Sequence, residues 1–74
     1  MKEEIAKILS VLFEREVSPD EDVSMENEYK WDSMRHIEII MTIEEELGIS
    51  FPPADIPTLT SMKKIIRKVE ELKA

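Results

Sequence analysis

The residues best suited to chemistry in this chain gather around Ser33, which follows Asp32 and precedes Met34. Aspartate is a preferred N-cap, so Asp32 predicts a helix whose first residue is Ser33. A hydroxyl at that position is exposed and lies beside backbone amides that favour an anion such as a phosphate. Ser33 is therefore a candidate for covalent modification. An Asp-Ser pair taken alone, however, is explained more simply as a capping acid followed by a polar first-turn residue.

A catalytic role for Ser33 has little support. His36 lies three residues further along the same predicted helix, but neither a third residue to orient it nor an oxyanion-binding group is evident. A serine hydrolase requires these groups together, so we predict no catalytic residue and no enzyme activity.

The acidic segment before Ser33 matches a calcium-binding loop only in part. Oxygen-bearing side chains alternate along it, at Asp20, Asp22, Ser24, Glu26 and Glu28. Counted from the first of them, an EF-hand requires glycine at the sixth position and glutamate at the twelfth, where this chain has Met25 and Trp31. We therefore predict no metal site, and only loose binding of a divalent cation by these acids stays open.

Hydrophobic periodicity predicts the elements that position Ser33. Apolar residues recur at helical spacing within residues 3–16, whereas residues 18–31 lack periodicity and read as a long acidic loop. The helix that begins after Asp32 is expected to run to Leu47, because Gly48, the only glycine, is a natural C-cap.

The rest of the chain predicts two more helical segments. Residues 49–53 read as a loop whose apolar side chains plug the core, and residues 54–59 as a short helical turn. A last helix is capped by Thr60 or Ser61 and runs to about Leu72. The expected fold is all-α, with three main helices, a short third helix and a long first loop.

The helix after Asp32 carries two apolar stripes when it is projected at about 100° per residue. One stripe would face the core and contains Ile39, Ile40, Ile43 and Leu47. The other points largely away from it and contains Met34, Ile37 and Met41, flanked by Glu38, Glu44 and Glu45. Methionine is common at adaptable binding surfaces. Periodicity alone leaves two explanations open, since this second stripe could pack under the long loop or contact a partner.

Length and composition limit the possible classes of protein. Seventy-four residues make one domain, residues 1–74, with a core too small to enclose an active site. A hydrophobic fraction of 42% and a charged fraction of 36% favour a small helical bundle. The lack of cysteine excludes disulfides, thiolate metal sites and a cysteine nucleophile. Because no long apolar run or secretory leader is present, we expect no membrane span and a cytoplasmic location.

The net charge of −7 is concentrated in the middle of the chain. Residues 17–47 contain ten acids against Lys30 and Arg35, whereas residues 48–74 contain three acids and five bases. An acidic middle repels phosphate backbones, so we predict no nucleic-acid binding. It would attract proteins with basic patches, although charge alone is explained more simply by solubility.

The stretch Trp31-Asp32-Ser33-Met34-Arg35-His36-Ile37-Glu38-Ile39-Ile40, followed by Glu44-Glu45-Glu46-Leu47-Gly48-Ile49, resembles the acyl carrier protein family. Its members share a D-S-[LM] attachment motif, an acidic recognition helix that ends in E-E-x-[FL]-G-[IV], and a four-helix fold. Further residues fit the family's short third helix and capped fourth helix, namely Ile56, Leu59-Thr60-Ser61-Met62 and Ile65-Ile66. The resemblance covers nearly the whole chain and implies an acyl-carrier-protein-like four-helix bundle.

The resemblance also implies a cofactor. A phosphopantetheinyl transferase that uses magnesium would move 4′-phosphopantetheine from coenzyme A to Ser33, with Asp32 orienting the site. The thiol of that arm would hold acyl or aminoacyl groups as thioesters in fatty acid, polyketide or related biosynthesis. A chain without cysteine suits this role, because the cofactor supplies the sulfur.

Partners follow from the same resemblance. The stripe of Met34, Ile37 and Met41 would dock on the transferase and on acyl- or aminoacyl-transferring enzymes. Basic docking patches of these enzymes would meet the acids Glu38, Glu44 and Glu45. We expect the protein to be a monomer. The main alternative is an unmodified acidic helical adaptor that docks through the same Met34, Ile37 and Met41 face.

Some residues depart from the family pattern. Lys30 stands where many members have glycine, Trp31 is bulkier than the usual residue, and Met34 replaces the commoner leucine. These changes point to a specialised stand-alone carrier. His36 projects toward the core side, and for it we favour a partly exposed or capping position over the entrance of an acyl cavity. The sequence does not identify the cargo.

Overall fold

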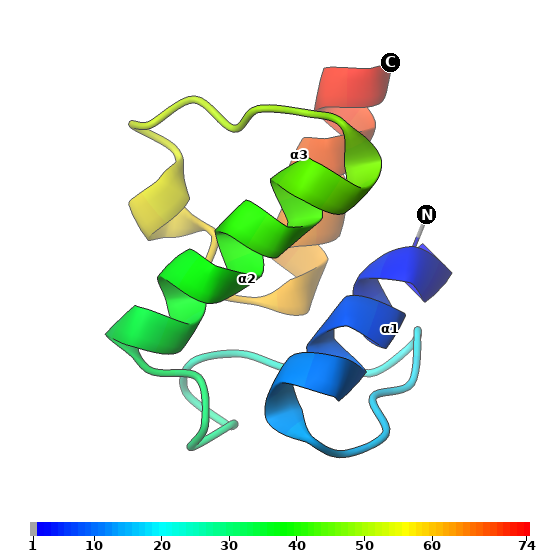
Figure 1. Cartoon of the computed structure of the whole chain (residues 1–74), viewed down its shortest axis with the longest axis vertical. Coiled ribbons are helices and arrows are strands. Elements are labelled where there is room, and N and C mark those ends of the chain that lie inside the picture. The colour runs from blue at the N-terminus through cyan, green and yellow to red at the C-terminus, as the bar shows by residue number, and fades with distance from the viewer. Residues whose placement is uncertain (1) are drawn as a thin grey trace.

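The computed structural model describes residues 2–74 and has four helical elements in chain order (Figure 1). Helix α1 spans Lys2–Phe13, α2 spans Ser33–Leu47, the 3-10 helix η1 spans Ile56–Thr58 and α3 spans Met62–Lys73. The predicted all-α fold of three main helices, a short third helix and a long first loop is confirmed.

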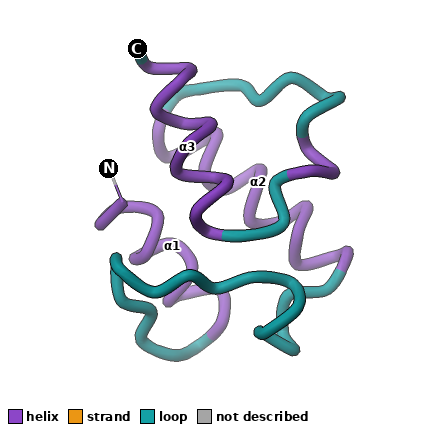
Figure 2. Tube along the Cα trace, turned by 180° about the vertical axis from the view of Figure 1, so that it is seen from behind, coloured by secondary structure: helices purple, strands orange, loops and turns teal. Residues whose placement is uncertain are grey.

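The three α-helices surround one core. Helix α2 lies in front of α3 in Figure 1, and the view from behind in Figure 2 places α3 nearer to the viewer. Helix α1 contacts both of them. The helices contribute Ile5, Leu9, Phe13, Ile39, Ile40, Ile43, Met62, Ile65 and Val69 to the core, and Val17, Val23, Trp31, Phe51 and Leu59 enter it from the loops. The predicted core face of α2 is confirmed except at Leu47, which is only partly buried.

Local capping sets both ends of α2. The Asp32 carboxylate accepts a hydrogen bond from the Arg35 amide at 2.8 Å, which satisfies one of the free amides of the first turn. Gly48 ends the helix in the left-handed region, with φ of 65°, where a residue with a side chain is disfavoured. Both bounds of this helix are as predicted. Helix α3 is capped by Ser61, not Thr60, because the Ser61 hydroxyl accepts from the Lys64 amide.

Helix α1 ends at Phe13, earlier than the helical pattern through residue 16 predicts. Glu14 adopts a left-handed backbone conformation with φ of 55°. The Arg15 amide then donates to the Ser10 carbonyl, and the Glu14 amide to the Val11 carbonyl. These two bonds form a Schellman motif, which terminates a helix and is usually made with glycine.

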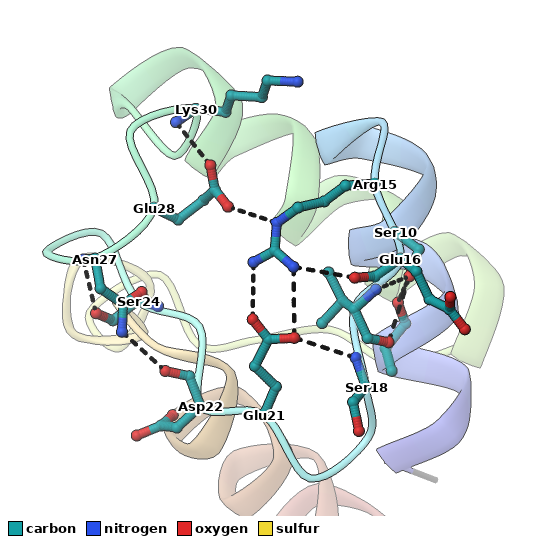
Figure 3. Close-up of polar contacts among 12 residues, drawn as sticks. Ser10, Arg15, Glu16, Ser18, Glu21, Asp22, Ser24, Asn27, Glu28 and Lys30 are labelled. Carbon is teal, nitrogen blue, oxygen red and sulfur yellow. Dashed lines mark hydrogen bonds and ion pairs between the residues drawn. The ribbon is translucent and has the colours of Figure 1, made fainter.

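The long loop between α1 and α2 is held by a cluster of ion pairs around Arg15 (Figure 3). The guanidinium donates to Glu28 through Nε and to Glu21 through Nη2, each at 2.9 Å. A third bond, from Nη1, reaches the Glu16 carbonyl. One cation therefore joins the end of α1 to the start and the end of the loop.

Backbone hydrogen bonds join the same loop to the start of α3. The Met62 amide donates to the Val23 carbonyl at 2.7 Å, and the Met25 amide donates to the Thr60 carbonyl at 3.0 Å. Val23 is buried between these bonds. The loop is thus a packed part of the fold, because its polar backbone groups and its apolar side chains are both satisfied.

Acid is expected to weaken the fold through Glu28. Burial disfavours its charged carboxylate, but hydrogen bonds from the Lys30 amide and the Arg15 guanidinium outweigh this and hold the pKa of Glu28 below its ordinary value of 4.5. Because the folded state then binds this proton less readily than the unfolded state, the stabilisation is complete above pH 4.5 and disappears as the pH falls through the lowered pKa.

The comparison of wild type with Glu28→Gln measures this effect by thermal denaturation across pH. The variant lacks the titrating group, so the gap between the two melting temperatures should be widest at neutral pH and should close in acid. A gap that stays constant down to about pH 3 would mean that the carboxylate contributes nothing through its charge.

Among residues 2–74, no helix is long and apolar enough to cross a membrane.

Candidate functional site

Ser33 is the first residue of α2 and is exposed to solvent. The neighbouring Asp32 performs the capping, so the Ser33 hydroxyl is not needed to hold the helix start. Within the described part of the chain, no hydrogen bond to this hydroxyl is recorded. The oxygen is therefore accessible, and replacing its hydrogen with a larger group would break no hydrogen bond within residues 2–74.

The other serines differ from Ser33 in what their hydroxyls contact. Four serines form hydrogen bonds to nearby backbone groups through the side-chain oxygen, namely Ser10, Ser18, Ser24 and Ser61. Ser50 is exposed and, among residues 2–74, has no recorded hydroxyl partner, but it lies in the loop after Gly48. Ser33 alone combines an exposed, unengaged hydroxyl with the first position of a helix, where the amides and the helix dipole favour an attached anion.

A shallow groove runs from Ser33 along the outer face of α2. It starts at the residues on both sides of Ser33 and has a volume of about 670 Å³. Its lining consists of Asp32, Met34, Arg35, Ile37, Glu38, Met41, Thr42 and Glu45. We call these residues the α2 groove.

A separate groove of about 410 Å³ lies between α1 and α2, and its lining includes the apolar residues Ile8, Val11, Leu12 and Leu47. Thr42 borders both grooves, whereas Asp32 and Met34 border only the α2 groove. The α2 groove is therefore the one that adjoins Ser33.

The second apolar stripe of α2 forms the floor of the α2 groove. Met34 is 85% exposed, Ile37 51% and Met41 62%. The possibility that this stripe packs under the long loop, which periodicity left open, is wrong. An exposed apolar stripe that is bordered by charged residues is typical of a surface that contacts another protein.

The charged side chains of the α2 groove are mostly acidic, and one of these acids is paired with a base. Arg35 donates to Glu38 at 2.9 Å, an ion pair between residues three apart on one helix. Glu45 is exposed, and no partner is recorded for its carboxylate among residues 2–74. Arg35 was not predicted to lie on this surface, although its spacing of three residues from Glu38 was the available signal.

Glu44 lies apart from the α2 groove. Its carboxylate accepts a hydrogen bond from the Phe51 amide at 2.7 Å, and the side chain is half-buried. The bond holds the turn after Gly48 against the end of α2 and helps to seat Phe51 in the core. Glu44, which was predicted to contact partner proteins, therefore makes its contact within the fold.

His36 is buried, with 7% of its surface exposed. Its Nδ1 lies 3.0 Å from the Trp31 indole nitrogen, and its Nε2 lies 2.8 Å from the Ile56 carbonyl oxygen. The partly exposed or capping position that we favoured for this residue is wrong, because the ring has partners inside the fold on both sides.

Several acids of the long loop make contacts within the fold. Asp20 pairs with Lys2, Asp22 accepts from the Lys63 amide, and Glu28 pairs with Arg15. Across residues 2–74, no group of three or more candidate metal ligands lies close together. Asp20, Asp22 and Glu28 are therefore engaged within the fold.

Comparison with known protein families gives a match over nearly the whole chain. The family model described as "Phosphopantetheine attachment site" matches residues 2–69. The match extends from the start of α1 through α2 and η1 to most of α3. No curated protein and no solved structure matches the chain significantly.

Proposed function

The chain belongs to the phosphopantetheine attachment site family, and we propose that Ser33 is the residue to which 4′-phosphopantetheine is joined. Domains of this family are carriers without catalytic activity, and the prosthetic group implied is 4′-phosphopantetheine. A carrier of this kind requires a transferase that loads it and enzymes that act on its cargo.

The observation that carries the choice of Ser33 is its unengaged hydroxyl at the start of α2. The residues around it fit a phosphodiester. Amides of the first helical turn have no intrahelical acceptor, and the positive end of the helix dipole favours a negative charge beside them. Asp32 holds this turn in place by accepting from the Arg35 amide.

The bound group supplies a thiol that carries acyl or aminoacyl cargo as a thioester, in fatty acid, polyketide or related biosynthesis. The protein's own contribution is to present the attachment oxygen and to offer the α2 groove to enzymes with basic docking patches. Met34, Ile37 and Met41 provide the apolar contacts of that docking surface, and Glu38 and Glu45 the acidic ones. We further propose that the chain acts as one domain, residues 1–74, and as a monomer.

Loading of the purified protein tests this function. The protein is incubated with coenzyme A, magnesium and a broad-specificity phosphopantetheinyl transferase, and its intact mass is then measured. We expect a gain of one phosphopantetheinyl group per chain. No gain under conditions that load a control carrier would instead support an unmodified adaptor that docks through the same surface.

Charge reversal in the α2 groove should slow loading. In Glu38→Lys with Glu45→Lys, a basic docking patch would meet positive charge, so the rate at low salt should fall while the melting temperature changes little. The matched control is Glu26→Lys with Glu70→Lys, which makes the same change in net charge at exposed positions outside the groove. Equal rates for the two double variants at low salt would remove electrostatic attraction from the account.

A further inference from the structure

Trp31 and His36 stand on either side of Ser33 in the sequence, and their side chains meet in the interior. The indole nitrogen lies 3.0 Å from His36 Nδ1, and the ring centroids are 6.1 Å apart with an interplanar angle of 24°. Trp31 is 2% exposed and also packs against Phe13 of α1, with ring centroids 5.8 Å apart. The segment that contains Ser33 is thus closed by a side-chain contact and anchored to a second helix.

The hydrogen bonds of His36 assign its protonation state. An indole N–H can only donate, so Nδ1 must accept and carries no hydrogen. The Ile56 carbonyl oxygen can only accept, so Nε2, 2.8 Å away, must carry the hydrogen. The ring is therefore a neutral imidazole with its hydrogen on Nε2, an assignment that follows from the network.

Protonation of His36 would break this arrangement. The imidazolium has a hydrogen on both nitrogens, so Nδ1 and the indole would present two donors to each other. The bridge from Trp31 through His36 to Ile56 therefore exists only with the neutral ring.

Charged groups on the surrounding elements have other partners. On α2 and its cap, Asp32 accepts from the Arg35 amide and Arg35 pairs with Glu38. On the long loop, the Lys30 ammonium donates to the Phe13 carbonyl. Beside η1, Asp55 pairs with Lys68 of α3 at 3.1 Å. In the described residues, no carboxylate is recorded in contact with the imidazole to stabilise its charged form.

We propose that neutral His36 is a positioning residue for the modification of Ser33. It joins Trp31, two residues before Ser33, to the Ile56 carbonyl of η1, and so fixes the direction in which the first turn of α2 presents the hydroxyl. Loss of the bridge, by substitution or by protonation, lets this turn move relative to α1 and η1. The inference rests on the proposed function, because it concerns the rate at which Ser33 is loaded.

Two substitutions at His36 separate positioning from packing. Glutamine keeps an acceptor and a donor, whereas leucine fills similar space but can form neither hydrogen bond. At pH 7.5 or above, we expect His36→Leu to load about tenfold more slowly than wild type, because misplacement of a reacting group is costly. His36→Gln should retain most of the rate, and circular dichroism should show both variants folded.

A pH series with the same proteins supplies the readout that packing alone would not change. Dividing the wild-type rate by the His36→Gln rate removes the transferase's own pH dependence. This ratio should fall as the pH is lowered, because the bridge from Trp31 to Ile56 requires the neutral imidazole. Trp31→Phe, which keeps an aromatic ring but loses the donor, should abolish most of that fall.

The outcomes distinguish the two proposals. Nitrogen chemical shifts of His36 that show hydrogen on Nδ1 at neutral pH would overturn the inference whatever the loading rates are. The inference would also be overturned if wild-type protein is loaded at Ser33 and the His36→Leu variant is loaded equally fast. A rate ratio that does not depend on pH would overturn it as well. A wild-type protein that is not loaded at all would overturn the proposed function, and this inference with it.

Discussion

Replacement of Ser33 with alanine is expected to abolish phosphopantetheine loading completely while leaving the melting temperature nearly unchanged. The hydroxyl is exposed and Asp32 provides the helix cap, so its removal costs no recorded contact in the described structure. Alanine is also a good helix former at the first position. Intact mass after incubation with transferase and coenzyme A measures the first effect, and thermal denaturation the second.

Ser50→Ala is the matched control for this variant. Ser50 is likewise exposed, and its hydroxyl has no recorded partner among residues 2–74, but it does not begin a helix. We expect it to load at the wild-type rate. Loading of Ser33→Ala, or loss of loading in Ser50→Ala, would contradict the choice of attachment residue.

Ile43→Ala should have the largest effect on stability. Ile43 is fully buried on the core face of α2, so truncation removes apolar contacts and leaves a cavity between the helices. Loss of a buried isoleucine side chain to alanine costs about 2–5 kcal/mol of unfolding free energy, which is a large share for a domain of this size. Urea denaturation followed by circular dichroism measures the loss.

Met41→Ala provides the comparison on the opposite face of the same helix. Met41 is 62% exposed and lies in the α2 groove, so its truncation should change stability by no more than about 0.5 kcal/mol. We expect it to slow loading instead, since it removes an apolar docking contact. Equal destabilisation by the two substitutions would mean that the faces of α2 are assigned wrongly.

Features set by nearby residues could be predicted from the sequence. Helix α2 begins and ends where predicted because its two signals are local, an aspartate N-cap and a glycine in the left-handed region. Helix α1 ends earlier than predicted because Glu14, which is not glycine, takes the left-handed conformation. The left-handed conformation of Glu14 is coupled to the position of Arg15. The ion-pair partners of Arg15, Glu21 and Glu28, lie further along the loop.

The sequence predicts which residues form the candidate site better than it predicts what those residues contact. Periodicity identified Met34, Ile37 and Met41 as a second stripe, but only the folded structure shows that residues 2–74 leave these side chains largely exposed. The partner of Glu44 is the backbone amide of Phe51, which follows the turn at Gly48. Because the donor is a backbone group, the type of side chain at residue 51 does not indicate this contact.

His36 shows the same limit more strongly. Its contact with Ile56 spans twenty residues and uses a backbone carbonyl, which any residue would provide. A histidine near a helix start therefore gave no indication that it bridges the attachment segment to η1. Such contacts depend on the tertiary arrangement, and a single sequence does not encode them in a local pattern.

The most direct measurement of the central claim is the position of the added group in the loaded protein. Trypsin cleaves after Lys30 and Arg35, which releases a peptide from Trp31 to Arg35 in which Ser33 is the only hydroxyl-bearing residue. Tandem mass spectrometry of the digest should find the phosphopantetheinyl group on this peptide and on no other. An unmodified Trp31–Arg35 peptide from fully loaded protein, or the group on a peptide that contains another serine, would contradict the account.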